Sequence, residues 1–159
     1  MASGVMTEAI LIIASIVVAT SIAGIVMSKV GSFESTFTAT SESQKNIMLT
    51  KLTIPYAIQN ATSTNIVEVW VKNIGIDPIT DPTSMDVYFG PVGSVKRYQY
   101  DTSAVDDTWK FKTLPTTIQK TDVVQIRITE SNPGLSAGTY MVRITAPNGV
   151  YSDYIFSIS

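Results

Sequence analysis

Residues 1–29 read MASGVMTEAILIIASIVVATSIAGIVMSK, and no charged residue interrupts them between Glu8 and Lys29. The 20 residues from 9 to 28 are uncharged and mostly apolar. As a helix rising about 1.5 Å per residue they span roughly 30 Å, close to the thickness of the hydrocarbon layer of a membrane. The length and composition of this stretch predict a membrane-crossing helix at the start of the chain.

A cleaved secretory signal is the first alternative to an anchor. Such a signal begins with positively charged residues and ends in a small-residue cleavage site, whereas residues 1–7 contain neither Lys nor Arg and are followed by Glu8. A buried helix of a soluble protein is the second alternative, but a helix that is apolar around its whole circumference is rare in so small a domain. We therefore expect residues 1–29 to be an uncleaved transmembrane helix, whose orientation the few flanking charges leave open.

Small side chains follow two neighbouring stripes of this helix. Thr20, Gly24 and Ser28 are four residues apart, and Ala14, Ser21 and Ser28 are seven residues apart. Small residues at such spacings let a second helix approach closely. We predict helix–helix packing along these stripes; the alternative is chance, because membrane helices are generally rich in small residues.

Residues 30–54 connect the apolar stretch to the rest of the chain. Val30, Phe33 and Phe37 are spaced as on one face of a helix, and Pro55 marks its expected end. The Ser/Thr-rich middle has weak helix propensity, so a flexible neck is the alternative. We expect an amphipathic helical stalk over residues 30–54 and a separate domain over residues 55–159.

The rest of the chain consists of short alternating runs. Residues 66–73, IVEVWVKN, alternate Val67, Val69 and Val71 with polar or larger residues, as a half-buried strand does. Six similar runs follow, at residues 85–89, 95–100, 108–112, 123–129, 139–145 and 150–159. Between the last two runs we expect Asn148–Gly149 at the positive-φ positions of a type I′ hairpin turn. Seven short strands predict an all-β, immunoglobulin-like antiparallel sandwich.

Composition argues against several classes of function. The 159 residues include no Cys and no His and carry a formal net charge of −2. Without Cys the chain has no disulfides and no Cys-based metal sites. Without His it lacks the commonest general acid/base and metal ligand. No basic patch indicates a nucleic-acid partner. Asp106 and Asp107 do not match the spacing of a calcium-binding loop, and Asp77 and Asp81 precede prolines as turn initiators. We expect no enzymatic activity, no cofactor, no metal and no nucleic-acid partner.

Two further features concern binding and modification. Asn60-Ala61-Thr62 meets the N-x-T rule, so Asn60 is a candidate glycosylation site if this part of the chain lies outside the cell; a chance match is the alternative. Several aromatic residues are expected mainly in the core, with an exposed ligand-binding surface as the alternative. They are Trp70, Tyr88, Phe89, Tyr98, Tyr100, Trp109 and Phe111.

A helix followed directly by an all-β domain resembles the plan of type IV pilin-like subunits of archaea. The chain resembles the FlaG family of archaellum (archaeal flagellum) accessory proteins at residues 1–29, at VEVWVKNIG (67–75), at SMDVYFG (84–90) and at PNGVYSDYIFSIS (147–159). The resemblance implies a stator protein of the motility apparatus, anchored in the cytoplasmic membrane by its helix, with the β-sandwich in the pseudoperiplasm. It also implies a FlaF-type partner and, through that partner, indirect contact with the surface layer.

Archaellins, the filament subunits, are similar in plan but are made with a short basic leader cut near a Gly. No Lys or Arg precedes Gly4, and Glu8 lies four residues after it, whereas pilins tend to carry Glu at the fifth mature position. We therefore expect the accessory protein. One alternative is an archaellin or pilin whose helices bundle into a filament core, and another is a membrane-tethered envelope-binding module. For the accessory protein and for the filament subunit we expect a homo-oligomer or filament, with an exposed strand edge as a contact.

Overall fold

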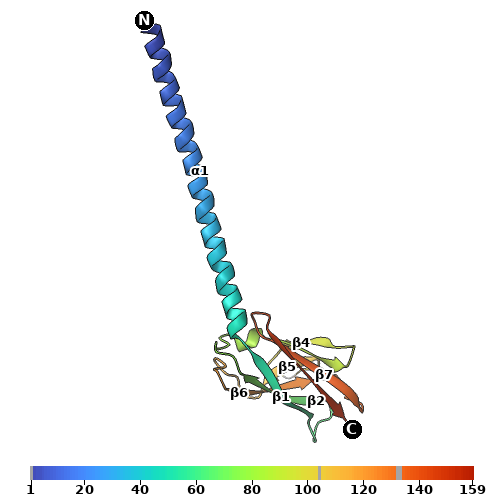
Figure 1. Cartoon of the computed structure of the whole chain (residues 1–159). Coiled ribbons are helices and arrows are strands. Elements are labelled where there is room, and N and C mark those ends of the chain that lie inside the picture. Colours follow the sequence, from blue (N-terminus) through green and yellow to red (C-terminus); the bar gives the residue numbers. More distant parts are fainter. Residues whose placement is uncertain (1, 104, 132–133) are drawn as a thin grey trace. The chain divides into compact units, whose positions relative to one another are not determined.

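A computed structural model of the chain describes residues 2–103, 105–131 and 134–159. These residues form one long helix followed by an all-β region (Figure 1). The chain divides into two compact units, of which the first ends at Ser43 and the second is Gln44–Ser159. We call the second unit the β-domain; it includes the last residues of the helix.

The helix α1 is Ala2–Leu49. It continues through the Ser/Thr-rich middle, where the hydroxyls of Ser32, Ser35 and Thr36 donate to carbonyl oxygens three or four residues earlier, at 2.9–3.0 Å. Such bonds satisfy the hydroxyls within the helix and remove their competition for backbone groups elsewhere.

Pro55 does not end a helix, contrary to our expectation. It lies within the strand β1 (Leu52–Gln59), which the sequence pattern did not reveal. The pairing of β1 with β2 (Ile66–Asn73) is irregular between Thr53 and Tyr56, so the N–H group that proline lacks is not needed there. The expected boundary between residues 54 and 55 therefore falls inside a strand, and the helix ends at Leu49.

The remaining strands follow the predicted runs closely. They are β3 (Asp86–Pro91), β4 (Lys96–Tyr100), β5 (Thr108–Phe111), β6 (Val123–Thr129), β7 (Gly138–Thr145) and β8 (Tyr151–Ile158), with a short 3₁₀ turn at Pro82–Ser84. The described residues thus form eight strands where we predicted seven. The predicted class, an N-terminal helix followed by an all-β sandwich, is confirmed.

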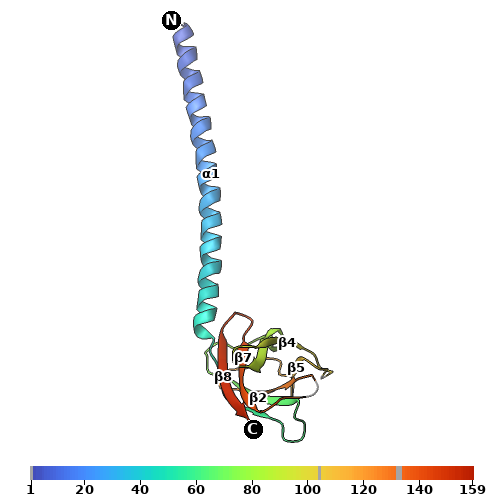
Figure 2. The same cartoon turned by 90° about the vertical axis from the view of Figure 1, so that its right-hand side faces the viewer.

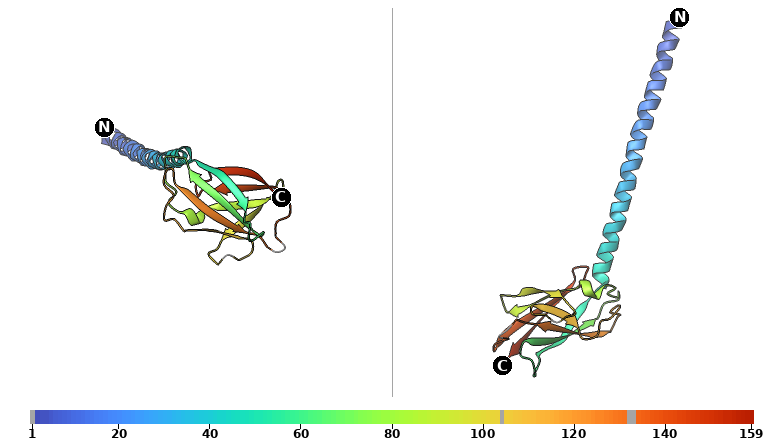
Figure 3. Two further views of the ribbon diagram at one scale, coloured as in Figure 1. Left: turned by 90° about the horizontal axis from the view of Figure 1, so that it is seen from below. Right: turned by 180° about the vertical axis from the view of Figure 1, so that it is seen from behind.

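The strands pair in the order β1-β2-β6-β5-β4-β3-β7-β8. Every neighbouring pair is antiparallel except β4 and β5, which are parallel. The two outer strands of this order, β1 and β8, lie against each other, so the sheet curves round on itself. Figure 2 shows β7 and β8 side by side, and Figure 3 shows the same strands from below and from behind.

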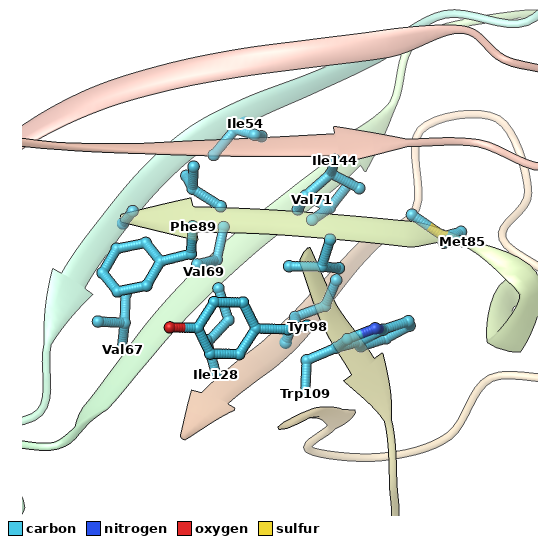
Figure 4. Packing of buried hydrophobic residues seen from close by; sticks show 14 of the residues in the cluster. Ile54, Val67, Val69, Val71, Met85, Phe89, Tyr98, Trp109, Ile128 and Ile144 are labelled. Atoms are coloured by element: carbon cyan, nitrogen blue, oxygen red, sulfur yellow. The ribbon is translucent and has the colours of Figure 1, made fainter. Parts of the chain in front are cut away.

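The core fills the space that the curved sheet encloses. Val67, Val69 and Val71 from β2 are fully buried and face Phe89 from β3 and Ile144 from β7 (Figure 4). This alternation buries every second residue of β2 and leaves the others on the outer face of the sheet. The outer face is therefore available for contacts that the core does not use.

The turn between β7 and β8 differs from the expected type I′. Gly149 has a φ of 86°, but Asn148 is not among the described residues with positive φ. The N–H of Gly149 donates to the carbonyl of Ala146 at 2.9 Å, which makes Pro147 and Asn148 the central residues of the turn. Proline fixes φ near −65° and favours a type I turn, with the glycine following in the left-handed region.

Candidate functional sites

The helix carries the most apolar surface of the chain. Between Val5 and Phe37 its large apolar side chains are all more than half exposed. By length and composition, the stretch Gly4–Leu49 is suited to cross a membrane. Apolar surface of this extent is unfavourable in water, so α1 is suited to lipid or to other apolar helices.

The residues predicted for helix packing lie on exposed faces of α1. The hydroxyl of Thr20 donates to the carbonyls of Ile16 and Val17, both at 3.0 Å, and that of Ser21 to Val17 at 2.7 Å. These hydroxyls therefore need no outside partner in an apolar environment. A Cβ atom on Gly24 would meet no atom of the described residues within 4 Å beyond its own stretch of helix. Ala14 and Ser28 are likewise exposed, and the packing of all five residues stays a prediction.

The end of α1 is capped by loops of the β-domain. The carbonyl of Leu49 accepts hydrogen bonds from the N–H groups of Ile76 and Asp77, at 2.8 and 3.3 Å. The carbonyl of Asn46 accepts from the backbone and side chain of Thr50, at 3.1 and 2.8 Å. Because the last carbonyls of a helix have no partner within it, the contacts of Leu49 hold the final turn against the loop after β2, within the β-domain. We call this set of contacts the joint.

Asn148 completes the joint from the β7–β8 turn. Its side-chain amide donates to the Thr50 hydroxyl at 2.7 Å and to the Asn46 carbonyl at 3.2 Å. The type I turn brings this side chain to the end of the helix. Sequence reasoning treated Asn148 only as a turn residue, since the contact spans 102 positions along the chain.

Asn73 and Gly75 fix the loop after β2, which contributes to the joint. Asn73 is fully buried; its amide donates to the carbonyls of Asp77 and Ile118 at 2.9 and 3.1 Å, and its oxygen accepts from the N–H of Gly75 at 2.9 Å. A Cβ atom on Gly75 would lie 2.4 Å from the Leu49 carbonyl oxygen. Both residues belong to the segment VEVWVKNIG, so that segment has a structural role as the support of the helix end.

Asn60 lies in the turn that joins β1 and β2. Its side-chain oxygen accepts hydrogen bonds from the N–H groups of Thr62 and Ser63, at 2.9 and 3.0 Å, and its amide nitrogen contacts a carboxylate oxygen of Glu68 at 3.3 Å. Asn60 is half-buried and Thr62 is exposed.

The aromatic residues separate into two groups. Phe89, Tyr98 and Trp109 are buried in the core. Trp70 instead lies on the outer face of β2, where its ring is 5.4 Å from that of Tyr56 on β1. The predicted core role therefore holds for the first group, while Trp70 is half-buried and pairs with the exposed Tyr56.

A half-buried charge cluster joins β4 to the end of β6. Lys96 Nζ lies 2.8 Å from a carboxylate oxygen of Asp107 and 2.6 Å from one of Glu130. Although burial lowers the pKa of Lys96, its hydrogen bonds to Asp107 and Glu130 raise it above the ordinary value. Burial and the hydrogen bond to Glu130 raise the pKa of Tyr98, whose hydroxyl donates to that carboxylate. With these charges paired, the cluster is suited to holding strands together.

Asp81 and Asp86 have hydrogen-bonding or ionic partners, and Asp106 is exposed. Asp81 accepts hydrogen bonds from Thr83 and Ser84 in its own turn, and the one to Ser84 is the main cause of a lowered Asp81 pKa. Asp86 pairs with Arg97, and Asp106 is exposed. Within the described part of the chain, no cluster of three or more acidic residues is arranged to hold a metal ion.

Comparison with known proteins places these features in a family context. The family model for archaeal-type flagellin matches residues 2–155. The structure is similar to that of the archaellum periplasmic stator protein FlaG from Sulfolobus acidocaldarius, at 32% identity and a TM-score of 0.60, over 68% of this chain and 100% of that one. It is similar also to a chain of the FlaF–FlaG stator complex from the same organism, at 32% identity and a TM-score of 0.59, over 68% of this chain and 90% of that one. A comparison with curated proteins gives no match.

Proposed function

Because the chain belongs to the archaeal-type flagellin family, we propose that it is a FlaG-type stator subunit of the archaellum. The observation that carries this proposal is the similarity to FlaG, which extends over the whole of one solved FlaG chain at 32% identity. The long apolar helix adds the means of anchoring.

The protein is anchored by α1, and its β-domain lies outside the cytoplasmic membrane, in the pseudoperiplasm. This arrangement follows from the similarity to a periplasmic stator protein together with the apolar helix. Residues 1–29 form the membrane-spanning part in this proposal, and residues 30–49 continue the helix towards the β-domain. The small residues Thr20, Gly24 and Ser28 then face a neighbouring helix within the membrane.

A stator must hold still while a rotor turns, so it needs a continuous mechanical path from one anchoring point to another. In the β-domain this path begins at the joint, where Asn46, Leu49 and Thr50 are held by backbone and side-chain hydrogen bonds. It continues through β1 and β2, which follow the joint directly and carry the buried valines of the core.

The partner at the far end of the path is a FlaF-type protein. A chain of a stator complex of FlaF and FlaG is similar to the present one, and FlaG itself is similar in fold. Contact with the surface layer is indirect, through that partner. The protein itself acts without chemistry: its relatives are structural proteins of the archaellum, and its sequence lacks His and Cys.

Deleting the gene tests the proposed function. We expect cells without the protein to lose swimming, and expression of the intact chain from a second locus to restore it. A matched strain expressing the chain with Ala19→Ile, a change on the helix side opposite Gly24, serves as a control for expression. Normal swimming of the deletion strain would refute the proposal.

A filament subunit is the second candidate, because the family model is that of flagellins. In that case the apolar helices bundle together in a filament core instead of anchoring single subunits in the membrane. The two candidates differ in where the protein is found, in the filament or in the envelope.

A further inference from the structure

The outer face of the β1–β2 hairpin carries an exposed apolar strip. Tyr56 pairs with Trp70 across the two strands, and Ile58 pairs with Glu68 in the next row. Tyr56 is 47% exposed and Ile58 is 41% exposed, while Trp70 is half-buried. We call Tyr56, Ile58 and Trp70 the outer strip. Aromatic side chains on an outer face offer a large apolar contact surface.

Asn60 lies at the end of this strip. Its amide nitrogen is 3.3 Å from the Glu68 carboxylate, which belongs to the row of Ile58. Glu68 is fixed in place by Arg127, at 3.0 Å, and by Gln125, at 2.9 Å. Because rows on one face of a strand are about 7 Å apart, the Tyr56–Trp70 pair is one row beyond the carboxylate that Asn60 touches.

The turn presents Asn60 in a defined orientation. Its oxygen is held by the N–H groups of Thr62 and Ser63, which directs the nitrogen toward the outer face. The contact with Glu68 uses one of the two hydrogens on that nitrogen, and the hydrogen bonds of the described residues include no partner for the other. Thr62, the third residue of the N-x-T triplet, is exposed.

We propose that Asn60 carries an N-linked glycan whose inner sugars lie over the outer strip. The modification rests on the β-domain lying outside the cytoplasmic membrane. In the reaction the nitrogen lone pair of Asn60 forms a bond to the anomeric carbon of a glycosyl phosphate or diphosphate donor. The bond from that carbon to the phosphate oxygen breaks, its electron pair leaves with the phosphate, and one proton is lost from the nitrogen.

The chemistry of the strip suits a carbohydrate. The C–H groups on the faces of a sugar ring carry slight positive charge, and the faces of Tyr56 and Trp70 are negative. Glu68 and Arg127 beside the strip supply hydrogen-bonding groups for sugar hydroxyls. A glycan attached at Asn60 is held next to this surface by its own bond, so its contacts need little affinity of their own.

Peptide mass spectrometry of the protein isolated from its own organism tests the attachment. Trypsin cuts after Lys51 and Lys72 and releases residues 52–72, which contain the N-x-T triplet. We expect this peptide to carry a glycan mass that fragmentation assigns to Asn60. Thr62→Ala should abolish the added mass and Thr62→Ser should retain it. An unmodified peptide, or a sugar on another residue, would overturn the proposal and would leave the stator function untouched.

Fluorescence quenching by acrylamide tests the position of the glycan. The chain has two tryptophans, and Trp109 is 1% exposed, so quenching reports on Trp70. We expect the Thr62→Ala protein, which lacks the glycan, to be quenched more strongly than the glycosylated Thr62→Ser protein. Equal quenching of the two proteins would overturn the placement over the strip.

Discussion

Gly75 lies where the loop after β2 passes over the end of α1. A Cβ atom at this position would lie 2.4 Å from both the Leu49 oxygen and the Lys51 nitrogen. We expect Gly75→Ala to lower the free energy of unfolding by about 2 kcal/mol, since backbone atoms on both sides must move. Thermal unfolding of the full chain in detergent, followed by Trp109 fluorescence, measures the change. Gly138→Ala is the control, because its nearest neighbour would be a side-chain atom at 3.7 Å; equal effects of the two changes would contradict the account.

Asn148 is the only side chain outside Gln44–Lys51 that hydrogen-bonds to Thr50 among the described contacts. We expect Asn148→Ala to cost about 1–2 kcal/mol of stability, for two lost hydrogen bonds, and to speed hydrogen exchange at the Thr50 N–H. Hydrogen exchange measured by NMR in micelles reports the effect. Asn65→Ala removes one long hydrogen bond outside the joint and should leave exchange at Thr50 unchanged; unchanged exchange in Asn148→Ala as well would show that the joint does not hold the helix end.

The small residues of α1 predict that this helix packs against another helix. A large side chain at Gly24 blocks close approach of a second helix on the small-residue side. We expect Gly24→Ile to reduce cross-linking between helices in membranes, and Ala19→Ile, on the opposite side of the helix, to leave it unchanged. Both changes introduce the same side chain, whose helix propensity lies above that of Gly and below that of Ala. Equal cross-linking in the two variants would contradict helix packing through this face.

The β7–β8 hairpin contains a pH-dependent ion pair. Arg143 and Asp153 are directly opposite in the register, with contacts of 2.6 and 2.7 Å. The hydrogen bond from Arg143 lowers the pKa of Asp153 below its ordinary value of 3.8. The pair therefore stabilises the folded protein above that value, and the contribution is lost as the pH falls through the lowered pKa.

Both partners are partly exposed, so we expect the pair to contribute about 0.5 kcal/mol. The difference in stability between the parent chain and Asp153→Asn should be present at pH 6 and should disappear in strong acid. Unfolding by urea at a series of pH values measures it, and Asp106→Asn controls for the change in net charge. A difference that persists in strong acid, below the lowered pKa of Asp153, would contradict the assignment.

The elements differ in how far sequence alone predicts them. The strand β2 was predicted with its correct bounds because the alternation of its valines reflects burial of one face. The strand β1 was missed because a proline such as Pro55 usually interrupts a strand. Only the irregular pairing beside it, which the sequence does not show, makes room for it. The role of Asn148 was missed for a similar reason: a contact across 102 positions leaves no local pattern. Packing of the exposed α1 residues depends on partners outside the chain, which no pattern within it identifies.

The protein combines an apolar anchor with a β-domain whose sheet curves round on itself. Family membership and the similarity to FlaG make it a structural component of the archaellum. The two units suit different tasks: α1 suits the membrane, and the β-domain suits contacts in the envelope. Within the second unit, the hydrogen bonds of the joint fix the last turn of the helix to the loops beside it.

The most direct test of the stator assignment is the distribution of the protein between sheared archaella and the remaining cell envelope. Quantitative mass spectrometry of both fractions gives this distribution, with the major filament protein and a known membrane protein as references. A stator subunit remains in the envelope fraction together with its FlaF-type partner and is at most a trace component of sheared filaments. Recovery of the protein as a main component of the filament mass would contradict the stator function and would make it a filament subunit.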